Sequence, residues 1–452
     1  MSIILLVIPT LLIGVISYYL WIWTYWKRRG IPGPIGLPFI GNAREMLSMG
    51  YPPPVRIRDW TRVSGYIMYL SNEHIQEYGP IYGFTEGTQK TLVISATELI
   101  NEVFVKQFDN FYGRKLNALQ GDSDKDMRAH LVTARGARWK RLRTISSPTF
   151  SNNSLRKILV TVEESALELM RHIENNKDKD IDMLKYYQEY TFDVIGRVAM
   201  GQNGSKMFNN PFIGDVKDLF GEKMSRLMLI CGIFPFYATF IRFVIMRFSH
   251  VIKSPIALIF QNMEDAVRKR MEQREEDGKK GIEIGEPADF IDLFLDARAD
   301  VDMLEEQNTD FNKQRVKVER QLTVDEIIGQ FFVFVAAGFD TSALSLSYTT
   351  YLLATHPNIM KKLQEEIDRE CPDPSMSFDQ LSKLKYMDCV LKEALRLYPL
   401  GTVWESDDQH HKSSYIAFGL GPRQCIGMRL AYMEEKLLLS HILRKYSFET
   451  TH

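Results

Sequence analysis

The sequence predicts a mainly α-helical protein with small β-sheets, preceded by one N-terminal transmembrane helix. Apolar residues recur with a period near 3.6 over long stretches at 154–175, 254–274, 323–355 and 377–398, which is typical of helices. Strand patterns are few and short. No charged side chain occurs from Ile3 to Trp26. These three observations favour one large helical domain behind a membrane segment.

Residues 1–26 are predicted to be a membrane anchor. At about 1.5 Å per residue, a helix of this length just spans a hydrocarbon core of about 30 Å. Aromatic residues cluster at its far end, and Lys27, Arg28 and Arg29 follow, which favours leaving the remainder of the chain in the cytosol. A cleaved signal peptide is the alternative. It would carry positive charge before the apolar run and small residues at a cleavage site, and neither is present here.

Residues 27–38 form a basic and proline-rich link, and residues 39–452 are predicted to be one domain. Because proline fixes φ, we expect a stiff, extended link that separates the anchor from the domain. Segments Ile81–Phe84 and Thr91–Ile94 are predicted to pair as strands around a turn at 86–89. A further apolar run at 227–247 contains Pro235 and Arg242, so a second membrane span is not expected. A membrane-surface segment and plain core packing both remain open for it.

Bulk composition excludes several classes of protein. Among 452 residues, the net charge of −1 gives no argument for nucleic-acid binding. The four cysteines are scattered without a CxxC pair, which argues against a tetrahedral zinc site and against a disulfide framework. We therefore expect the domain to face a reducing compartment.

The most informative motif is the run from Phe418 to Gly427, which contains Cys425. A lone cysteine is more often a buried, inert side chain than a ligand. Here two preceding glycines permit a turn with unusual dihedral angles and close backbone approach. Such a turn can aim amide N–H groups at a thiolate sulfur and tune a bound metal. Arg423 can meet a carboxylate in bidentate fashion.

A second motif, Ala337–Ser342, lies inside a long apolar helix predicted from Glu326 to Thr355. An acid such as Asp340 is costly in that setting unless it has partners. Thr341 can bond to an earlier carbonyl and loosen the helix, and Gly338 leaves a gap. The arrangement suits a small ligand and a water beside an acid, although a small-residue helix crossing with a capped acid would also explain it.

Two shorter patterns are weaker when taken alone. Glu393 and Arg396 are spaced i, i+3 and so share a helix face, which usually gives a surface salt bridge. The run from Trp139 to Arg143 is a basic helix segment, and the basic residues around it suit an acidic redox partner. A solvated charge run would look the same.

Together these four motifs resemble those of the cytochrome P450 family, and they occur in the family's order. The resemblance implies the cytochrome P450 fold over the chain from Pro32 onward and haem b as cofactor. It implies Cys425 as the axial thiolate and a proton relay through Asp340 and Thr341. The other residues that it places at the cofactor are Trp139, Arg143, Gly338, Phe418, Arg423 and Gly427.

The implied activity is insertion of one oxygen atom from O2 into a lipophilic small molecule. Electrons would come from NADPH through a flavoprotein reductase, and the location would be the endoplasmic reticulum membrane. A thiolate-haem isomerase is a further possibility, but the retained Asp340–Thr341 pair argues against it.

The chain departs from the family at one place. Only 28 residues separate Arg396 from Cys425, about half the usual interval, and no arginine lies between Arg396 and Arg423. The family uses that interval for strands on the substrate side and for an arginine that joins a buried Glu393–Arg396 pair; Trp404 is a candidate remnant. Residues 56–80, conversely, are longer than the family pattern requires. A splice variant, an imperfect gene model or a divergent protein would each explain this. The alternative function is therefore a catalytically impaired, membrane-bound haem or lipid-binding protein.

Overall fold

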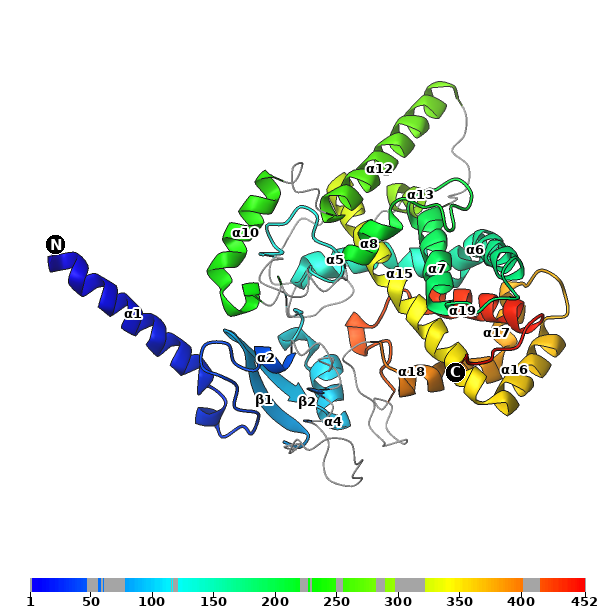
Figure 1. Cartoon of the computed structure of the whole chain (residues 1–452). Helices are drawn as coiled ribbons and strands as arrows, with labels where there is room; N and C mark the ends of the chain where they lie inside the picture. Colours follow the sequence, from blue (N-terminus) through cyan, green and yellow to red (C-terminus); the bar gives the residue numbers. More distant parts are fainter. Residues whose placement is uncertain are drawn as a thin grey trace.

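The computed structural model describes residues 2–46, 56–57, 60, 78–114, 116, 121–219, 227, 230–248, 255–281, 289–296, 322–400 and 415–451. These residues form a mostly helical body with one small sheet, from which the N-terminal helix projects (Figure 1). This arrangement is consistent with the predicted fold class.

The helices of the described part follow the chain from the projecting α1 to the C-terminal α19. Their bounds are α1 Ser2–Trp23, α2 Ala43–Met46, α4 Thr97–Asn101, α5 Gly136–Ser146, α6 Asn152–Glu174, α7 Met183–Ala199, α8 Ile213–Leu219, α10 Pro235–Arg247, α12 Pro255–Lys279, α13 Phe290–Asp296, α15 Val324–Thr355, α16 Pro357–Glu370, α17 Phe378–Lys383, α18 Lys385–Leu397 and α19 Met428–Leu443. Short turns of 3-10 or π type are η1 Lys27–Arg29, η2 Glu102–Lys106, η3 Phe108–Asn110, η5 Ser147–Phe150 and η7 Gly421–Arg423.

The predicted strand pair is confirmed. Strands β1 (Ile81–Glu86) and β2 (Gln89–Ile94) are antiparallel, with Ile81 opposite Ile94 and Glu86 opposite Gln89. The predicted helix over 377–398 is instead two helices, α17 and α18. Leu384 is buried with ψ near 77°, outside the helical region, so the helix breaks there. Most of the segments 56–80 and 297–320 lies outside the described residues.

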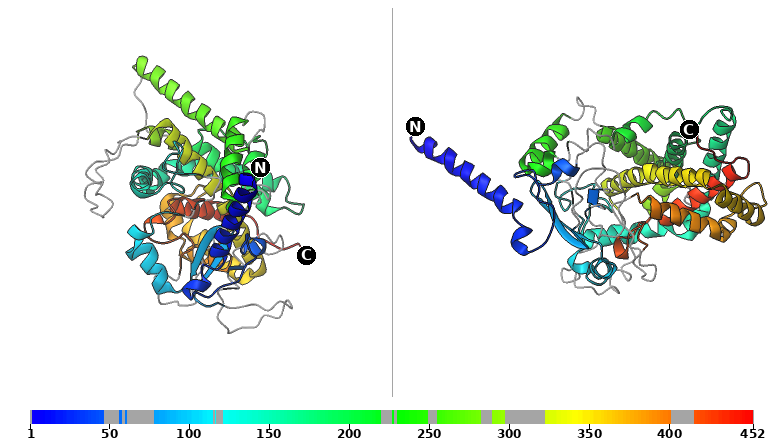
Figure 2. Two further views of the ribbon diagram at one scale, coloured as in Figure 1. Left: turned by 90° about the vertical axis from the view of Figure 1, so that its left-hand side faces the viewer. Right: turned by 60° about the horizontal axis from the view of Figure 1, so that its bottom comes forward.

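Helix α15 runs through the middle of the helical body (Figures 1 and 2). It begins with a capping box, in which the Thr323 hydroxyl accepts from the Glu326 amide and the Glu326 carboxylate accepts from the Thr323 amide. Buried apolar side chains from α6, α7, α12, α15 and α19 form one continuous core. Such a core fixes α15 on several sides and thereby places the segment around Asp340.

The C-terminal end of α1 packs directly against the domain, which differs from the separating link expected from the sequence. Ile22 is almost fully buried, and the Tyr19 hydroxyl donates to the carbonyl of Ile233 at 3.0 Å. The indole N–H groups of Trp23 and Trp26 donate to the carbonyls of Gly36 and Phe84 at 2.6 and 2.9 Å. Aromatic side chains thus hold the helix end, and the proline-rich link wraps beside it.

Two apolar helices have compositions relevant to a membrane. By length and composition α15 could span one, but 61% of its apolar stretch is buried inside the protein, as expected of a core helix. The described side chains of α1, from Val7 to Trp23, form a shorter apolar helix and are mostly exposed. In the apolar run at 227–247, the described part includes α10, which begins at Pro235 as proline at a helix start allows.

Candidate functional site

The loop that carries Cys425 is a tight turn held by its own backbone. Gly419 and Gly421 both have φ near +70°, a conformation that other residues adopt only with strain. A Cβ atom on Gly421 would also clash with the carbonyl oxygen of Phe104. The Cys425 amide donates to the carbonyl of Phe418 at 2.8 Å and closes the turn. The predicted role of the two glycines is confirmed.

The Cys425 sulfur accepts hydrogen bonds from backbone amides, as the motif predicts. The donors are the N–H groups of Gly427 and Met428 at the start of α19. The side chain keeps contact with solvent, but the surrounding protein removes enough water to raise the pKa of the thiol. The two amides and the guanidinium groups of Arg143 and Arg114 act in the opposite direction. A metal cation would tip this balance to the thiolate.

Arg423 fixes the loop to the neighbouring part of the domain. Its guanidinium donates to the carbonyls of Leu131, Tyr112 and Ala134 at 3.0, 2.6 and 2.8 Å, and it lies 4.4 Å from the ring centre of Trp139. Burial and the two neighbouring arginines lower its pKa to about 10. Its Nε is buried and has no hydrogen-bond partner among the described residues.

Three guanidinium groups gather beside the loop without a carboxylate. Besides Arg423 they belong to Arg143, on α5, and Arg114, whose Nη2 donates to the Arg423 carbonyl at 3.4 Å. Burial lowers the pKa of each, and mutual repulsion adds to the effect at Arg143 and Arg423. In the described part of the chain none of the three forms an ion pair. A ligand that carries two carboxylates, as haem does, fits this cluster and the unpartnered Nε.

The remaining residues predicted at the cofactor lie around this loop. Trp139 is buried between Arg423 and Phe108. The Phe418 ring packs on Tyr432, with centroids 5.1 Å apart, and its carbonyl receives the Cys425 amide. Gly427 caps the start of α19 and has only ordinary contact with Phe150. Trp139 thus supports the arginine, and Phe418 supports the loop backbone.

The α15 segment has the predicted bond from Thr341 to an earlier carbonyl, within a helix that is continuous from Val324 to Thr355. The Thr341 hydroxyl donates to the carbonyl of Ala337 at 2.5 Å, and both residues are exposed although the helix is largely buried. Asp340 has a partner that the sequence did not reveal. The amide Nε2 of Gln188, on α7, donates to Asp340 Oδ1 at 2.9 Å. The acid is therefore held by a neutral donor.

Gly338 does not leave the open gap expected from the sequence. A Cβ atom there would lie 3.0 Å from the terminal methyl group of Ile195, on α7. The absence of a side chain lets α7 approach α15 closely, so the space is filled by the neighbouring helix. Within this segment the exposed positions are instead Ala337 and Thr341.

The opposite face of the segment contacts α19 through a buried carboxyl. The Ser342 hydroxyl donates to Glu434 Oε1 at 2.5 Å, and Glu435 follows on the same helix. Burial raises the pKa of both carboxyls to about 8, and repulsion between them adds to the shift at Glu435. Both are therefore largely protonated at neutral pH.

Glu393 and Arg396 form the predicted pair, but the pair is not buried as the family resemblance implies. Two hydrogen bonds of 2.7 Å join the guanidinium to the two carboxylate oxygens. The side chains are 54% and 46% exposed. Of the following interval, residues 401–414, including Trp404, lie outside the described residues.

The basic patch around Trp139 is largely neutralised within the protein. Arg141 and Arg138 both pair with Glu326, and Arg135 pairs with Asp122 and Asp124. These arginines tie α5 and the preceding loop to α15. The expectation that they form an open face for an acidic partner is therefore not supported by their contacts.

Sequence reasoning did not identify Arg114, Gln188 and Glu434. Arg114 and Gln188 lie in no recognisable motif, and their roles come only from packing against residues far along the chain. For Glu434 a signal was present, because two adjacent acids interrupt the apolar pattern of a helix.

Comparison with known proteins gives one consistent result. The sequence model of the cytochrome P450 family matches residues 60–405 and 403–452, in two stretches that meet inside the interval between Arg396 and Cys425. The cytochrome P450 protein CYP13A10 of Caenorhabditis elegans is 53% identical over 503 positions, covering 99% of this chain and 94% of the relative. CYP13A3 of the same organism is 52% identical over 507 positions, covering 100% and 94%.

Proposed function

The chain belongs to the cytochrome P450 family, and from that premise we propose that it is a microsomal monooxygenase acting on lipophilic small molecules. The family supports a haem-thiolate monooxygenase with haem b as cofactor and O2 as a substrate. The observation that carries the proposal is the Cys425 loop, with two amides aimed at the sulfur and three guanidinium groups beside it.

The Cys425 loop and the residues that surround it would hold the haem. Cys425 would bind the haem iron as a thiolate, and Arg114, Arg143 and Arg423 would bind the two propionates, with Trp139 packed on Arg423. When bound, the haem supplies oxygen activation, which a thiolate ligand favours by donating electron density. The Gly427 and Met428 amides keep the sulfur oriented and reduce its charge density.

Asp340 and Thr341 would supply protons from α15. The Thr341 hydroxyl is exposed on a helix face where its neighbours are small. The Asp340 carboxyl is adjacent along the chain and is oriented through Oδ1. Such a carboxyl can give a proton toward the Thr341 side and recover one from water.

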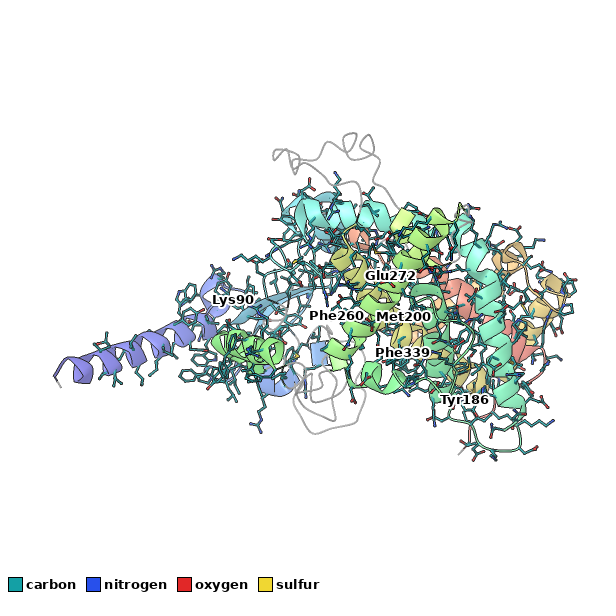
Figure 3. The ribbon with its side chains drawn as sticks, turned by 90° about the horizontal axis from the view of Figure 1, so that it is seen from above. Lys90, Tyr186, Met200, Phe260, Glu272 and Phe339 are labelled. Carbon is teal, nitrogen blue, oxygen red and sulfur yellow. The ribbon has the colours of Figure 1, made fainter. Side chains whose placement is uncertain are left out.

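The membrane part of the proposal rests on α1. Residues 1–26 would form a single-pass anchor in the endoplasmic reticulum membrane, residues 27–38 a link, and residues 39–452 a cytosolic haem domain. In support, the described side chains of α1 expose a mostly apolar surface, and α10 exposes the rings of Tyr237, Phe240 and Phe243. Helix α10 lies on the same side of the domain as α1 (Figure 1). At the end of α1, Lys90 of β2 lies over the rings of Trp21 and Tyr25 (Figure 3), which suits a membrane interface.

Electrons would come from NADPH through a flavoprotein reductase in the same membrane. This part follows from the family and the anchor, and it does not depend on the arginines near Trp139, which pair internally.

The second candidate function is a catalytically impaired haem or lipid-binding protein. Two observations favour it. The 503 positions aligned with CYP13A10 exceed the 452 residues of this chain by 51, so that many residues of the relative have no counterpart here. The family match also breaks at 403–405, shortly after the half-exposed Glu393–Arg396 pair.

The test uses the full-length chain purified with haem in lipid nanodiscs. Reduction under carbon monoxide should give the absorption band diagnostic of thiolate ligation. Cys425→Ala should lose that band, whereas Cys389→Ala, at another exposed cysteine, should keep it. An intact band in Cys425→Ala would overturn the ligand assignment.

Added reductase and NADPH then decide between the two functions. Product formation from lipophilic test substrates supports the monooxygenase. A normal thiolate band without any product over a broad substrate panel supports the impaired protein.

A further inference from the structure

We propose that Gln188 is a positioning residue that orients the Asp340 carboxyl for proton delivery. The inference deepens the proposed function and rests on the role assigned there to Asp340. Gln188 belongs to α7, about 150 residues earlier in the chain, and no motif draws attention to it. Its amide is nevertheless a hydrogen-bond donor to Asp340 Oδ1.

Helix α7 contacts α15 at three consecutive residues next to Thr341. Ile195 packs at 3.0 Å from the position of a Cβ atom on Gly338. The Thr191 hydroxyl donates to the carbonyl of Phe339 at 2.7 Å, and Gln188 donates to Asp340 at 2.9 Å. Phe339 itself is buried in the helical body (Figure 3). One face of α7 thus fixes the backbone and the acid of the same short segment.

The donor itself is firmly placed. Tyr187 and Tyr190 flank this face of α7 and are fully buried. The Tyr190 hydroxyl also reaches α19, where it donates to the Glu434 carbonyl at 3.2 Å. Because α7 is held to both α15 and α19, the backbone that carries Gln188 is fixed relative to Asp340. The contact can therefore define the orientation of Asp340.

The neutrality of the donor matters for proton transfer. Among the described residues no lysine, arginine or histidine forms an ion pair with Asp340. A cationic partner would strongly favour the charged carboxylate and hold its proton affinity low. An amide orients Oδ1 with one hydrogen bond and leaves Oδ2 available. The carboxyl can then release a proton at Oδ2 and take one back from water, with no net change.

Two substitutions separate positioning from packing. Gln188→Met keeps the length of the side chain but removes the donor. Gln188→Glu keeps the shape and polarity but places an acceptor, negatively charged when ionised, against Oδ1. If Gln188 only fills space, Gln188→Glu should resemble the native protein at least as closely as Gln188→Met. If it positions Asp340, Gln188→Glu should be the more harmful change. Thr191→Val is the matched control, because it removes the neighbouring bond from α7 to the backbone of α15.

The first measurement is coupling, the product formed per NADPH consumed, in holoenzyme with normal haem content. We expect Gln188→Met to lower coupling on the order of tenfold, corresponding to about 1.4 kcal/mol and within the range for a hydrogen bond to a charged group. Gln188→Glu should lower it further, and Thr191→Val should change it less than twofold. Equal coupling in Gln188→Met and native protein, or a milder loss in Gln188→Glu than in Gln188→Met, would overturn the proposal.

The second measurement does not depend on turnover. Infrared difference spectra against Asp340→Asn identify the carboxylate band of Asp340. Loss of a donor to Oδ1 should shift that band in Gln188→Met, and Thr191→Val should leave it in place. An unshifted band in Gln188→Met would contradict the proposed contact.

Asp340→Asn also separates this inference from the proposed function. If that variant retains native coupling, the role of Asp340 itself is wrong. If it loses coupling while Gln188→Met does not, the role of Asp340 stands and the role of Gln188 is refuted.

Discussion

The loop around Cys425 and the α15 segment around Asp340 differ in how their polar groups are partnered. On the loop side, three guanidinium groups repel one another and Arg423 Nε lacks a partner among the described residues. On the α15 side, neutral donors serve the acids, with Gln188 on Asp340 and Ser342 on Glu434. The loop side is thus prepared for a negatively charged ligand, whereas the acids on the α15 side are held by uncharged hydrogen-bond donors. Cofactor binding and proton handling are separated in this way.

The largest effect should come from Arg423→Ala on the loop side. It leaves three carbonyls without their donor, and each buried unsatisfied group costs about 1–3 kcal/mol. We expect the free energy of unfolding to fall by about 3–5 kcal/mol, and haem affinity to fall with it. Denaturant unfolding and haem titration measure the two effects. Arg429→Ala, at an exposed arginine early in α19, is the control and should be nearly silent. If Arg423→Ala changed neither the free energy of unfolding nor the haem affinity, the proposed contrast between the Cys425 loop and the α15 segment would be wrong.

The α15 side should respond to pH through Glu434 and Glu435. Their pKa of about 8 in the folded protein is above the usual value of 4.5, so the folded state keeps protons that the unfolded chain releases. Their contribution to stability is therefore full below about pH 4.5 and is lost as pH rises through 8. We expect a decrease on the order of a few kcal/mol between pH 5 and 9, measured by urea unfolding.

Glu434→Gln combined with Glu435→Gln should flatten this dependence, because an amide does not titrate. A dependence that stays as steep in the double variant would show that other groups cause it.

The smallest effect is expected at Glu393. Because the Glu393–Arg396 pair is half exposed, Glu393→Ala should cost at most about 1 kcal/mol in unfolding free energy. The hydrogen bonds from Arg396 lower the pKa of the Glu393 carboxyl, and its partial burial acts in the opposite direction. A loss of several kcal/mol, or loss of haem, would show that the pair is more deeply integrated than its exposure indicates.

Local features of this protein could be predicted from sequence, and tertiary partners could not. The strand pair, the α15 helix and the glycine turn before Cys425 follow from short-range patterns, and the structure has them. The break at Leu384 was missed because an apolar residue on a periodic face gives no sign of its backbone angle.

The partners of the site come from distant parts of the chain. Gln188 reaches Asp340, and Glu326 neutralises Arg138 and Arg141, only because helices cross in space. From the sequence alone, the basic run around Trp139 therefore suggests a surface open to an acidic partner. In the structure, Arg138 and Arg141 of this run are paired with Glu326.

The attachment of α1 also bears on how this protein is best produced. Tyr19, Ile22 and Trp26 cover part of the domain, and the ring of Trp26 lies directly on Gly83. A shortened chain that starts after Arg29 would expose this apolar surface and invite aggregation. One that starts at Tyr18 would discard most of the exposed apolar helix and keep the covering residues. The choice of first residue should decide whether a water-soluble version stays monodisperse.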